Sequence, residues 1–397
     1  MELPTGERAS YNFYRVLRSI WRGSGVSRTE LAATHKLDKT TISQIVAELI
    51  EQGIVGVQEI DTSIQRPGRK SELLTVSDDW GIVAGIELRP DGIRACATDM
   101  HANVIAAHHH RQLVERTTLR DAFMNSLEGL QADDRVDGRP LVGVGVGLSG
   151  IVNAQLQSIV KSIPLNILDP YDFREQISRH VRVPVLVDND ADCGAWSELV
   201  HDGDQRSSNF MFVLIEFRTP PQREHYGGDI GVGFGFVIDG SVYYGGSGAA
   251  GEFRSLYWHP GYRNQLAVPD AEAHDVLDKP DVLPRVIEEL ASHVGVFANV
   301  LDLGAVYVGG DVSTIKDLVL GSFYSAIQNN WPYDEERDCV VELASLEDDI
   351  VAVGAASMVL EHIFQEPVLP AGLRARNRVW QTILSARAAA PVPRRSP

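Results

Sequence analysis

Residues 27–53, SRTELAATHKLDKTTISQIVAELIEQG, predict two short helices that meet across a tight turn. Ser27 and Glu30 have the spacing of a capping box, so the first helix is expected to begin at Arg28 and to run to about Lys36. Asp38 can cap the second helix, and Gly53 can end it. Behind Asp38, aliphatic side chains recur at the spacing of one buried helical face, namely Ile42, Ile45, Val46, Leu49 and Ile50.

The opposite face of the second helix is polar and hydrogen-bonding. Such side chains in the first turns are typical of a recognition helix that reads base edges in the major groove. With two residues at the start of the preceding helix, the predicted DNA contacts here are Arg28, Thr29, Lys39, Thr40, Thr41, Ser43 and Gln44. The alternative is an ordinary helical hairpin whose polar face meets water.

The flanking segments favour a winged helix-turn-helix over residues 1–77. Upstream, a helical stripe can close a three-helix core, with Phe13, Val16, Leu17, Ile20 and Trp21 as its members. Downstream, residues 54–60 and 73–76 read as two strands joined by a polar loop. The tip of this wing is basic, and we expect Arg66, Arg69 and Lys70 to contact phosphates beside the groove.

Length and composition indicate a cytoplasmic protein of several parts. A chain of 397 residues is too long for one compact core and suits two or three lobes. No apolar run is long enough to span a bilayer, and residues 1–10 lack the layout of a signal peptide. Cys96, Cys193 and Cys339 lie far apart without metal-ligand spacing, so we interpret them as small core residues and predict no metal site.

Charge is distributed unevenly along the chain. Residues 1–71 contain ten Lys and Arg against eight Asp and Glu, a formal charge of +2. Because the whole chain has a net charge of −18, the rest of the chain must carry −20. DNA would repel this acidic body, which leaves the N-terminal module as the part that can approach it. Residues 367–397 have no acidic residue and are interpreted as a basic tail, its final part disordered, which either adds a phosphate contact or only keeps the chain soluble.

Residues 78–366 alternate between strand and helix patterns. We expect strands at 82–88, 93–98, 141–148, 183–187, 209–216, 231–244 (a glycine-rich pair) and 305–308, and helices at 119–130, 171–180, 191–200, 284–301, 315–329 and 351–365. Two successive α/β units with a glycine-rich crevice between them predict a two-lobed ligand-binding fold. Residues 218–229, which contain a proline pair, are expected to be a surface loop whose role the sequence does not indicate.

The segment VDNDAD, residues 187–192, lies where a strand ends and a helix begins. This position puts Asn189 and Asp190 at the mouth of a crevice, where an amide and a carboxylate can together bind adjacent sugar hydroxyls. The competing interpretation is that Asp188 or Asn189 only caps the helix.

Two glycine-rich segments are also candidates. In IGVGFGFVIDG, residues 230–240, alternating glycines admit either a phosphate or another strand close to the backbone. The segment GGSGAAGEF, residues 245–253, carries Glu252 as its only charged side chain, a candidate hydroxyl acceptor. In VYVGGDV, residues 306–312, a strand enters a diglycine turn that either holds a nucleotide or only turns the chain.

In their order and spacing these segments resemble the ROK family of repressors and sugar kinases, over about residues 12–364. The marks are SRTELA with the RPGRK wing, GIEL at 85, VDNDAD at 187, GVGFGF with VIDG and AAGEF, VGGD at 308 and VGAA at 353. The resemblance implies an actin-like, ribonuclease H-like sugar-kinase fold behind the winged helix-turn-helix. It further implies that repressor-branch proteins bind operator DNA as dimers or higher oligomers and commonly respond to a sugar or sugar phosphate.

Carried over to this chain, the resemblance implies that Asn189, Asp190 and Glu252 bind sugar hydroxyls, with Asp190 at the general-base position of the kinases. Where the family usually has Gly-His, this chain has Arg254 and Ser255. The family's zinc-binding cysteine cluster follows there, but residues 255–270 of this chain contain no cysteine, so we expect no zinc site. Ser255 and His259 complete the predicted sugar site. The first phosphate loop is also altered, because Leu88–Asp91 is bulky and acidic and opposes ATP phosphates.

The first hypothesis is therefore a sugar-responsive regulator of carbohydrate genes that works without a cofactor, as a homodimer or homotetramer, with operator DNA and a sugar as partners and no membrane. The second is a sugar kinase with an appended DNA-binding module. The third is a constitutive DNA binder that has lost its effector.

Overall fold

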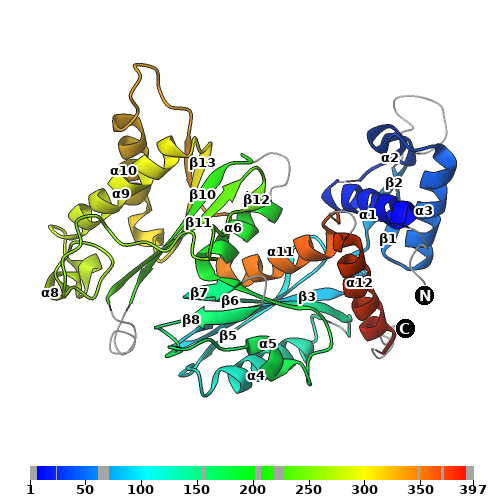
Figure 1. Cartoon of the computed structure of the whole chain (residues 1–397), viewed down its shortest axis with the longest axis horizontal. Coiled ribbons are helices and arrows are strands. Elements are labelled where there is room, and N and C mark those ends of the chain that lie inside the picture. Colours follow the sequence, from blue (N-terminus) through cyan, green and yellow to red (C-terminus); the bar gives the residue numbers. More distant parts are fainter. Residues whose placement is uncertain are drawn as a thin grey trace.

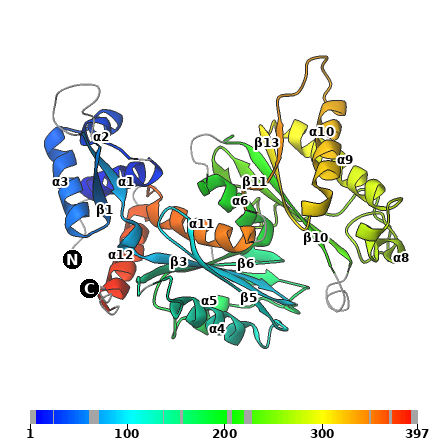
Figure 2. The same ribbon diagram turned by 180° about the vertical axis from the view of Figure 1, so that it is seen from behind.

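The computed structural model describes residues 7–23, 25–60, 71–136, 138–153, 157–201, 207–218, 228–346, 349–367 and 371–389. It consists of a small N-terminal head, two lobes built on β-sheets, and a C-terminal helix that lies beside the head (Figure 1). Seen from behind, the head and the second lobe lie at opposite ends of the molecule (Figure 2).

The head contains three helices and a two-stranded sheet. Its elements are α1 (Glu7–Arg22), α2 (Arg28–His35), α3 (Lys39–Glu51), β1 (Val55–Ile60) and β2 (Ser71–Val76). The predicted capping box between Ser27 and Glu30 is present, and Asp38 accepts a hydrogen bond from the backbone of Thr41. The predicted buried face of α3 is confirmed for Ile42, Ile45, Val46 and Leu49, whereas Ile50 is only partly buried. Antiparallel pairing of β1 with β2 confirms the wing strands.

Each lobe is built on a five-stranded sheet, and the two sheets share one strand order. In the first lobe the order is β5-β4-β3-β6-β9, and in the second it is β12-β11-β10-β13-β14. In both sheets, the first three strands of this order pair antiparallel with one another, and the last two strands are added in parallel. The strands of the first sheet are β3 (Ile82–Arg89), β4 (Gly92–Thr98), β5 (Val104–Arg111), β6 (Leu141–Leu148) and β9 (Val185–Asn189). Those of the second are β10 (Phe210–Phe217), β11 (Ile230–Ile238), β12 (Ser241–Val242), β13 (Ala305–Gly310) and β14 (Val340–Leu343).

Helices cover both sheets. On the outer faces lie α4 (Leu119–Gln131) with α5 (Phe173–Ile177) in the first lobe, and α9 (Leu283–Val300) with α10 (Lys316–Asn329) in the second. Between the sheets lie α6 (Asp190–His201) and α11 (Ile350–Phe364), which pack on each other (Figure 1). The smaller elements are β7 (Ile151–Asn153), β8 (Ser158–Lys161), α8 (Asp270–Ala273), η1 (Asp78–Trp80), η3 (Val276–Asp278) and η4 (Ser313–Ile315).

Most of the predicted body elements are confirmed within one or two residues. The helix expected over 171–180 is wrong in extent, because only Phe173–Ile177 is helical and the chain turns before β9. The sequence pattern also does not predict α12 (Ala371–Ala389) in the basic C-terminal stretch. Trp380 and Ile383 of this helix are fully buried, which no charge count could reveal. Residues 390–397, where we expect disorder, lie outside the described residues.

Close packing of α11 requires glycine at its contacts with both neighbours. A Cβ at Gly354 would lie 1.7 Å from the carbonyl oxygen of Cys193 in α6. A Cβ at Gly85 in β3 would lie 1.9 Å from the carbonyl oxygen of Ala352. These separations are far below van der Waals contact, so the backbones of β3, α11 and α6 meet directly.

The head shares one hydrophobic core with α11 and α12. Trp21 of α1 stacks on Phe364 of α11 at 4.8 Å and donates a hydrogen bond of 2.7 Å to the carbonyl of Met100. Arg18 and Arg22 both pair with Glu361 of α11, at 2.5 and 2.6 Å. On the other side, the ring of Trp380 in α12 lies 5.4 Å from that of Trp80. The head is therefore fixed to the C-terminal end of α11 by apolar contacts and ion pairs together.

The remaining sequence expectations concern membranes, metals and thiols. Among the described residues, none of the helices combines the length and hydropathy that crossing a bilayer requires. All three cysteines are buried and unpaired, as the sequence predicts. Within the same residues, no group of three His, Cys, Asp or Glu side chains lies close enough to hold a metal ion.

Candidate functional site

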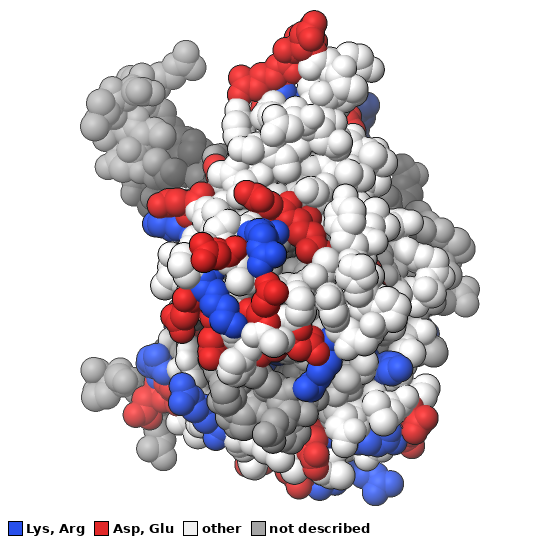
Figure 3. Space-filling view, turned by 90° about the vertical axis from the view of Figure 1, so that its left-hand side faces the viewer, with Lys and Arg blue, Asp and Glu red and all other residues white. Residues whose placement is uncertain are grey.

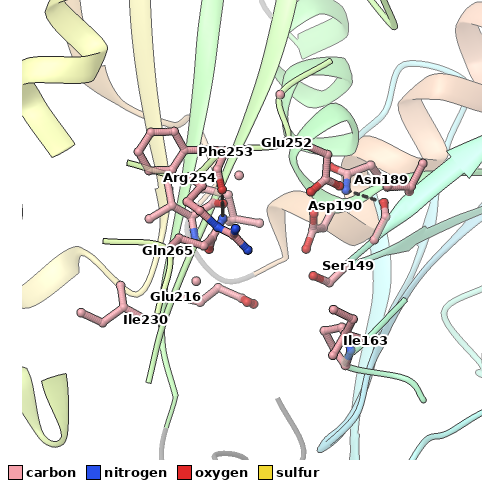
Figure 4. A pocket seen from close by; sticks show the side chains of 18 of the residues that line it. Ser149, Ile163, Asn189, Asp190, Glu216, Ile230, Glu252, Phe253, Arg254 and Gln265 are labelled. Carbon is pink, nitrogen blue, oxygen red and sulfur yellow. Dashed lines mark hydrogen bonds between the residues drawn. The ribbon is translucent and has the colours of Figure 1, made fainter. Parts of the chain in front are cut away.

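A pocket of about 320 Å³ lies between the two lobes and is lined from both of them. The first lobe contributes residues 149–151 and Lys161, and the second contributes the ends of β10 and β11 with residues 250–254. Asn189 and Asp190 line it where β9 passes into α6. Figure 4 shows Asp190 and Ser149 on one side of the pocket, across from Phe253, Arg254 and Gln265.

Asp190 is the buried carboxylate of this pocket, with only 8% of its surface exposed. One carboxylate oxygen accepts a hydrogen bond of 2.9 Å from the backbone N–H of Ala191. Burial, together with the neighbouring charge of Glu216, raises the pKa of Asp190 to about 7. The group can therefore exchange a proton near neutral pH and can accept a hydrogen bond from a hydroxyl.

Asn189 lines the pocket but is also a structural residue. Its side-chain amide donates to the carbonyl of Gly150 at 2.8 Å and accepts from the backbone N–H of Ala191 at 2.8 Å. Asn189 therefore has the capping role of the competing interpretation as well as its place in the pocket, and it ties the first turn of α6 to the neighbouring loop. Asp188 points elsewhere, accepting a hydrogen bond of 2.7 Å from the hydroxyl of Tyr244.

Glu252 lines the same pocket because the backbone before it is unusual. Gly251 has φ +88°, and a Cβ there would lie 1.8 Å from the carbonyl oxygen of Phe234 in β11. Only glycine fits this turn, which presses residues 250–252 against the second sheet. Partial desolvation raises the pKa of the Glu252 carboxyl. The structure thus brings together Asn189, Asp190 and Glu252, three of the five predicted sugar-site residues.

Ser255 and His259, the other two residues of the predicted site, do not line this pocket. Ser255 is buried, and its hydroxyl lies 3.1 Å from Nε2 of His293. His259 is exposed and contacts Tyr262 edge to face. Residues missed by the sequence interpretation are Ser149, Lys161, Arg218, Arg254, Arg263 and Gln265. Arg254 carried a signal, because it is a charged residue where the family pattern has glycine.

Arg89 of β3 forms an ion pair across the two lobes. Its guanidinium lies 2.9 Å from Glu216 of β10 and 3.1 Å from Glu87, and its Nε lies 3.4 Å from Asp91. Burial would raise the pKa of Glu216, but the charges of Arg89 and Arg218 outweigh it and lower that pKa. The hollow that remains around these side chains has a volume of only about 20 Å³. This cluster occupies the place where the sequence predicts an altered phosphate loop.

The glycines of the other two candidate segments serve packing. Cβ atoms at Gly233 and Gly235 of β11 would lie 3.0 and 2.4 Å from atoms of Ala191, so these glycines admit α6. At Gly310, with φ +94°, a Cβ would lie 2.1 Å from the carbonyl oxygen of Ile215. A second hollow of about 310 Å³ borders this diglycine turn, so the alternative of a nucleotide at this turn stays a hypothesis.

In the head, the first turns of α3 present Lys39, Thr40, Ser43 and Gln44 on an exposed face. Two other predicted contacts are engaged within the protein. The hydroxyl of Thr41 donates to Asp38 at 2.7 Å, and Arg28 pairs with Glu72 of β2. Thr29 is exposed at the start of α2. Arg66, Arg69 and Lys70 lie outside the described residues.

Comparison with known proteins agrees with this arrangement. Residues 83–258 match the model of the ROK family.

This chain carries a ROK-family domain.

Proteins similar to this chain include regulators. It is 26% identical to a xylose repressor of Bacillus spizizenii over 238 residues, which are 60% of this chain and 58% of that protein. It is 23% identical to a putative xylose repressor of Caldicellulosiruptor sp. over 399 residues, which are 89% of this chain and 96% of that protein.

Solved structures establish the fold of this chain. A ROK family transcriptional regulator, a homologue of the E. coli MLC protein, superposes with a TM-score of 0.72 at 15% identity, covering 96% of this chain and 100% of that one. A ROK family glucokinase from Streptomyces griseus, solved with glucose and AMPPNP, gives a TM-score of 0.54 at 20% identity over 70% of this chain and 99% of its own. The two lobes therefore have the actin-like fold.

Proposed function

We propose that this chain is a sugar-responsive transcriptional regulator, a repressor of carbohydrate-metabolism genes, that binds operator DNA through residues 1–77 and a sugar or sugar derivative through residues 78–366. The observation that carries the proposal is that the exposed face of α3 belongs to a head that shares its core with α11. This helix lies between the sheets and packs on α6, whose first residue, Asp190, lines the interlobe pocket. A ligand that moves one lobe against the other can therefore act on the head.

The end of the molecule opposite the head is a poor surface for DNA. At the end of the molecule that carries α8, α9 and α10, acidic and basic side chains are mixed in one part and a broad area is uncharged (Figure 3). The described residues of that end form no continuous basic surface for phosphates. A recognition helix on a cytoplasmic homodimer or homotetramer would read two half-sites of a pseudo-palindrome.

The test is to select duplexes from a random-sequence pool with the purified full-length chain, and then to titrate sugars into the selected complexes. We expect a half-site repeat, binding that weakens steeply with salt, and a sugar that changes the affinity for this sequence alone. Recovery of no preferred sequence would overturn the proposal. Sequence-specific binding that no sugar alters, together with no sugar that raises the thermal stability, would leave the constitutive DNA binder instead.

Substitution of Asp190 by Ala tests the pocket assignment. We expect Asp190→Ala to abolish the sugar response while leaving operator affinity intact, because Asp190 lies in the pocket and far along the chain from α3. Asp317→Ala, at an exposed site on α10, is the matched control and should respond as the parent does. A sugar response that survives in Asp190→Ala would show that the ligand binds elsewhere.

A sugar kinase with an appended DNA-binding module is the second candidate. Asp190 in the pocket and the hollow beside Gly310 favour it. The ion-pair cluster around Arg89 opposes it, because Arg89 is already engaged by Glu87, Asp91 and Glu216, and the hollow beside these side chains has a volume of only about 20 Å³. A coupled assay of ATP consumption with each sugar separates the two, and steady sugar-dependent turnover would favour the kinase.

A further inference from the structure

The interlobe pocket is rich in basic side chains although the chain as a whole is strongly acidic. Among the described residues that line it, the basic ones are Lys161, Arg218, Arg254 and Arg263, and the acidic ones are Asp190, Glu216 and Glu252. The formal charge of this lining is +1, whereas the whole chain carries −18. A pocket for a neutral sugar has no need of such an excess, since hydroxyls are bound as well by amides and carboxylates.

Two of these cations have no acidic partner within the described part of the chain. Glu216 is shared by Arg218, at 3.4 Å, and by Arg89 of the first lobe. In contrast, no described carboxylate pairs with Arg254, whose guanidinium lies over the ring of Trp258 at 4.2 Å. Lys161, at the end of β8, likewise pairs with no carboxylate that the structure describes. One unpaired cation therefore comes from each lobe.

The backbone around Arg254 is held in place by Gln265. The side-chain amide of Gln265 donates to the carbonyls of Phe253 at 2.8 Å and of Val232 at 2.7 Å. The main-chain carbonyl of Gln265 accepts a hydrogen bond of 2.8 Å from the backbone N–H of Ser255. The residues on both sides of Arg254 are thus tied to one residue that also binds β11. The backbone that carries Arg254 is therefore fixed, and its guanidinium lies over the ring of Trp258.

The acids of the pocket oppose an anion less than their number suggests. Burial, with the nearby charge of Glu216, raises the pKa of Asp190 to about 7, and desolvation raises that of Glu252. Glu216 is neutralised by its two arginines. At neutral pH the repulsion of a bound anion is therefore reduced.

We propose that the ligand of this pocket is a small carbohydrate that carries one anionic group, a carboxylate or a phosphate, bound by Arg254 and Lys161. The planar guanidinium forms paired hydrogen bonds with both kinds of anion. Asp190 and Glu252 are left to bind hydroxyls. An anion that contacts both cations joins the two lobes, because Lys161 belongs to the first and Arg254 to the second. This inference rests on the proposed sensing function and gives its effector a chemical class.

The test compares matched probes on the full-length chain by calorimetric titration and thermal shift. Glucose is the neutral probe, and glucuronate and glucose 6-phosphate are its carboxylate and phosphate counterparts. Xylose and xylonate form a second pair. We expect at least one anionic probe to bind about tenfold or more tightly than its neutral parent, and its affinity to fall as salt rises. The preferred counterpart distinguishes a sugar acid from a sugar phosphate.

Two variants connect this preference to the named cations. Arg254→Gln should weaken the preferred anionic probe by about tenfold or more and change the neutral parent by less than about twofold. Lys161→Gln should also weaken the anionic probe more than its neutral parent. Because Lys161 is exposed, this substitution should leave the fold intact, so a loss of binding would not come from misfolding. Lys316→Gln, at an exposed lysine of α10, is the matched control and should change neither.

Three results would overturn the inference: equal or tighter binding of the neutral probes, an equal loss of both probe classes in Arg254→Gln and Lys161→Gln, or binding of no probe at millimolar concentration. Sequence-specific DNA binding and its response to a neutral sugar would persist in the first two cases, so the proposed regulator would stand. Failure of the regulator itself appears instead as the absence of any preferred duplex.

Discussion

At the scale of single residues, the two candidate sites depend on a few side chains that the fold does not use otherwise. Gln44 is exposed on α3 and makes no hydrogen bond to a described residue, so its amide is available to a partner. Asp190 is the opposite case, a buried carboxylate whose protonation the fold controls. Each leads to a measurable expectation.

Gln44→Ala should weaken binding to the selected duplex by about 1–3 kcal/mol, and the loss should disappear on duplexes altered at one base position, because a bidentate amide contact reads one base. Fluorescence anisotropy on a set of single-base variants measures this. Gln131→Ala, at an exposed site on α4, is the matched control. An equal affinity of the Gln44→Ala protein for every duplex of the set would exclude the role.

Asp190 should make the protein less stable as pH rises. Its pKa is raised from 3.8 to about 7, so between these values the folded protein keeps a proton that the unfolded chain has released. Stability therefore falls as pH increases through this window and is lowest above pH 7. Asp190→Asn removes the titration at constant size, so its melting temperature should depend less on pH between 5 and 8 and exceed that of the parent at pH 8. An unchanged pH slope would contradict the shift.

At the scale of elements, α11 is the helix on which the others depend, and glycine sets its distance from them. Its contacts run from β3 and β6 to α6 and, at its C-terminal end, to α1 and α12. The sequence interpretation identifies this helix from its apolar pattern and VGAA. It does not identify the two contact faces, because a glycine inside a helix pattern says nothing of which backbone approaches it.

Gly354→Ala should destabilise the protein although alanine is the better helix former by about 1 kcal/mol. The added Cβ would lie 1.7 Å from the carbonyl oxygen of Cys193, so α6 and α11 must move apart, and such overpacking costs typically about 1–3 kcal/mol or more. Gly321→Ala in α10 is the matched control, since nothing lies within 4 Å of its Cβ position. Denaturant unfolding should show the two variants shifting in opposite directions. A stabilised Gly354→Ala protein would refute the close contact.

At the scale of the whole molecule, Glu361 of α11 joins the head, which carries the proposed recognition helix, to the helix that packs beside the proposed ligand pocket. This carboxylate, with its side chain 10% exposed, binds Arg18 and Arg22 of the head at once. The stacked pair of Trp21 and Phe364 adds an apolar contact beside it. A displacement of α11 by closure of the lobes must move these groups, because packed interiors do not deform continuously.

Glu361→Gln should therefore reduce the factor by which the sugar changes operator affinity, while the ligand-free protein still binds the operator. The variant loses the charge of a partly buried pair, and we expect a loss of about 1–3 kcal/mol in unfolding free energy. Anisotropy titrations with and without sugar measure the coupling, and Asp317→Asn is the surface control. An undiminished coupling factor would show that the signal takes another route.

The sequence by itself determined the elements and the general chemistry of this protein. Capping residues, helical and strand periodicity and turn glycines act locally, so Ser27, Glu30, Asp38 and the buried stripe of α3 could be identified without a fold. Local reasoning also placed Asn189 and Asp190 at a crevice mouth, because a strand ends and a helix begins there, whereas the family resemblance joined Glu252 to them; all three line one pocket.

Only the tertiary structure decided which residues meet across the chain. Ser255 contacts His293 and does not line the pocket. Arg89 pairs with Glu216 across the two lobes. The basic C-terminal stretch forms α12, whose Trp380 is buried beside the head. Each of these contacts joins residues that are far apart in sequence, and their geometry depends on how sheets and helices pack. Charge and periodicity carry no information on that packing.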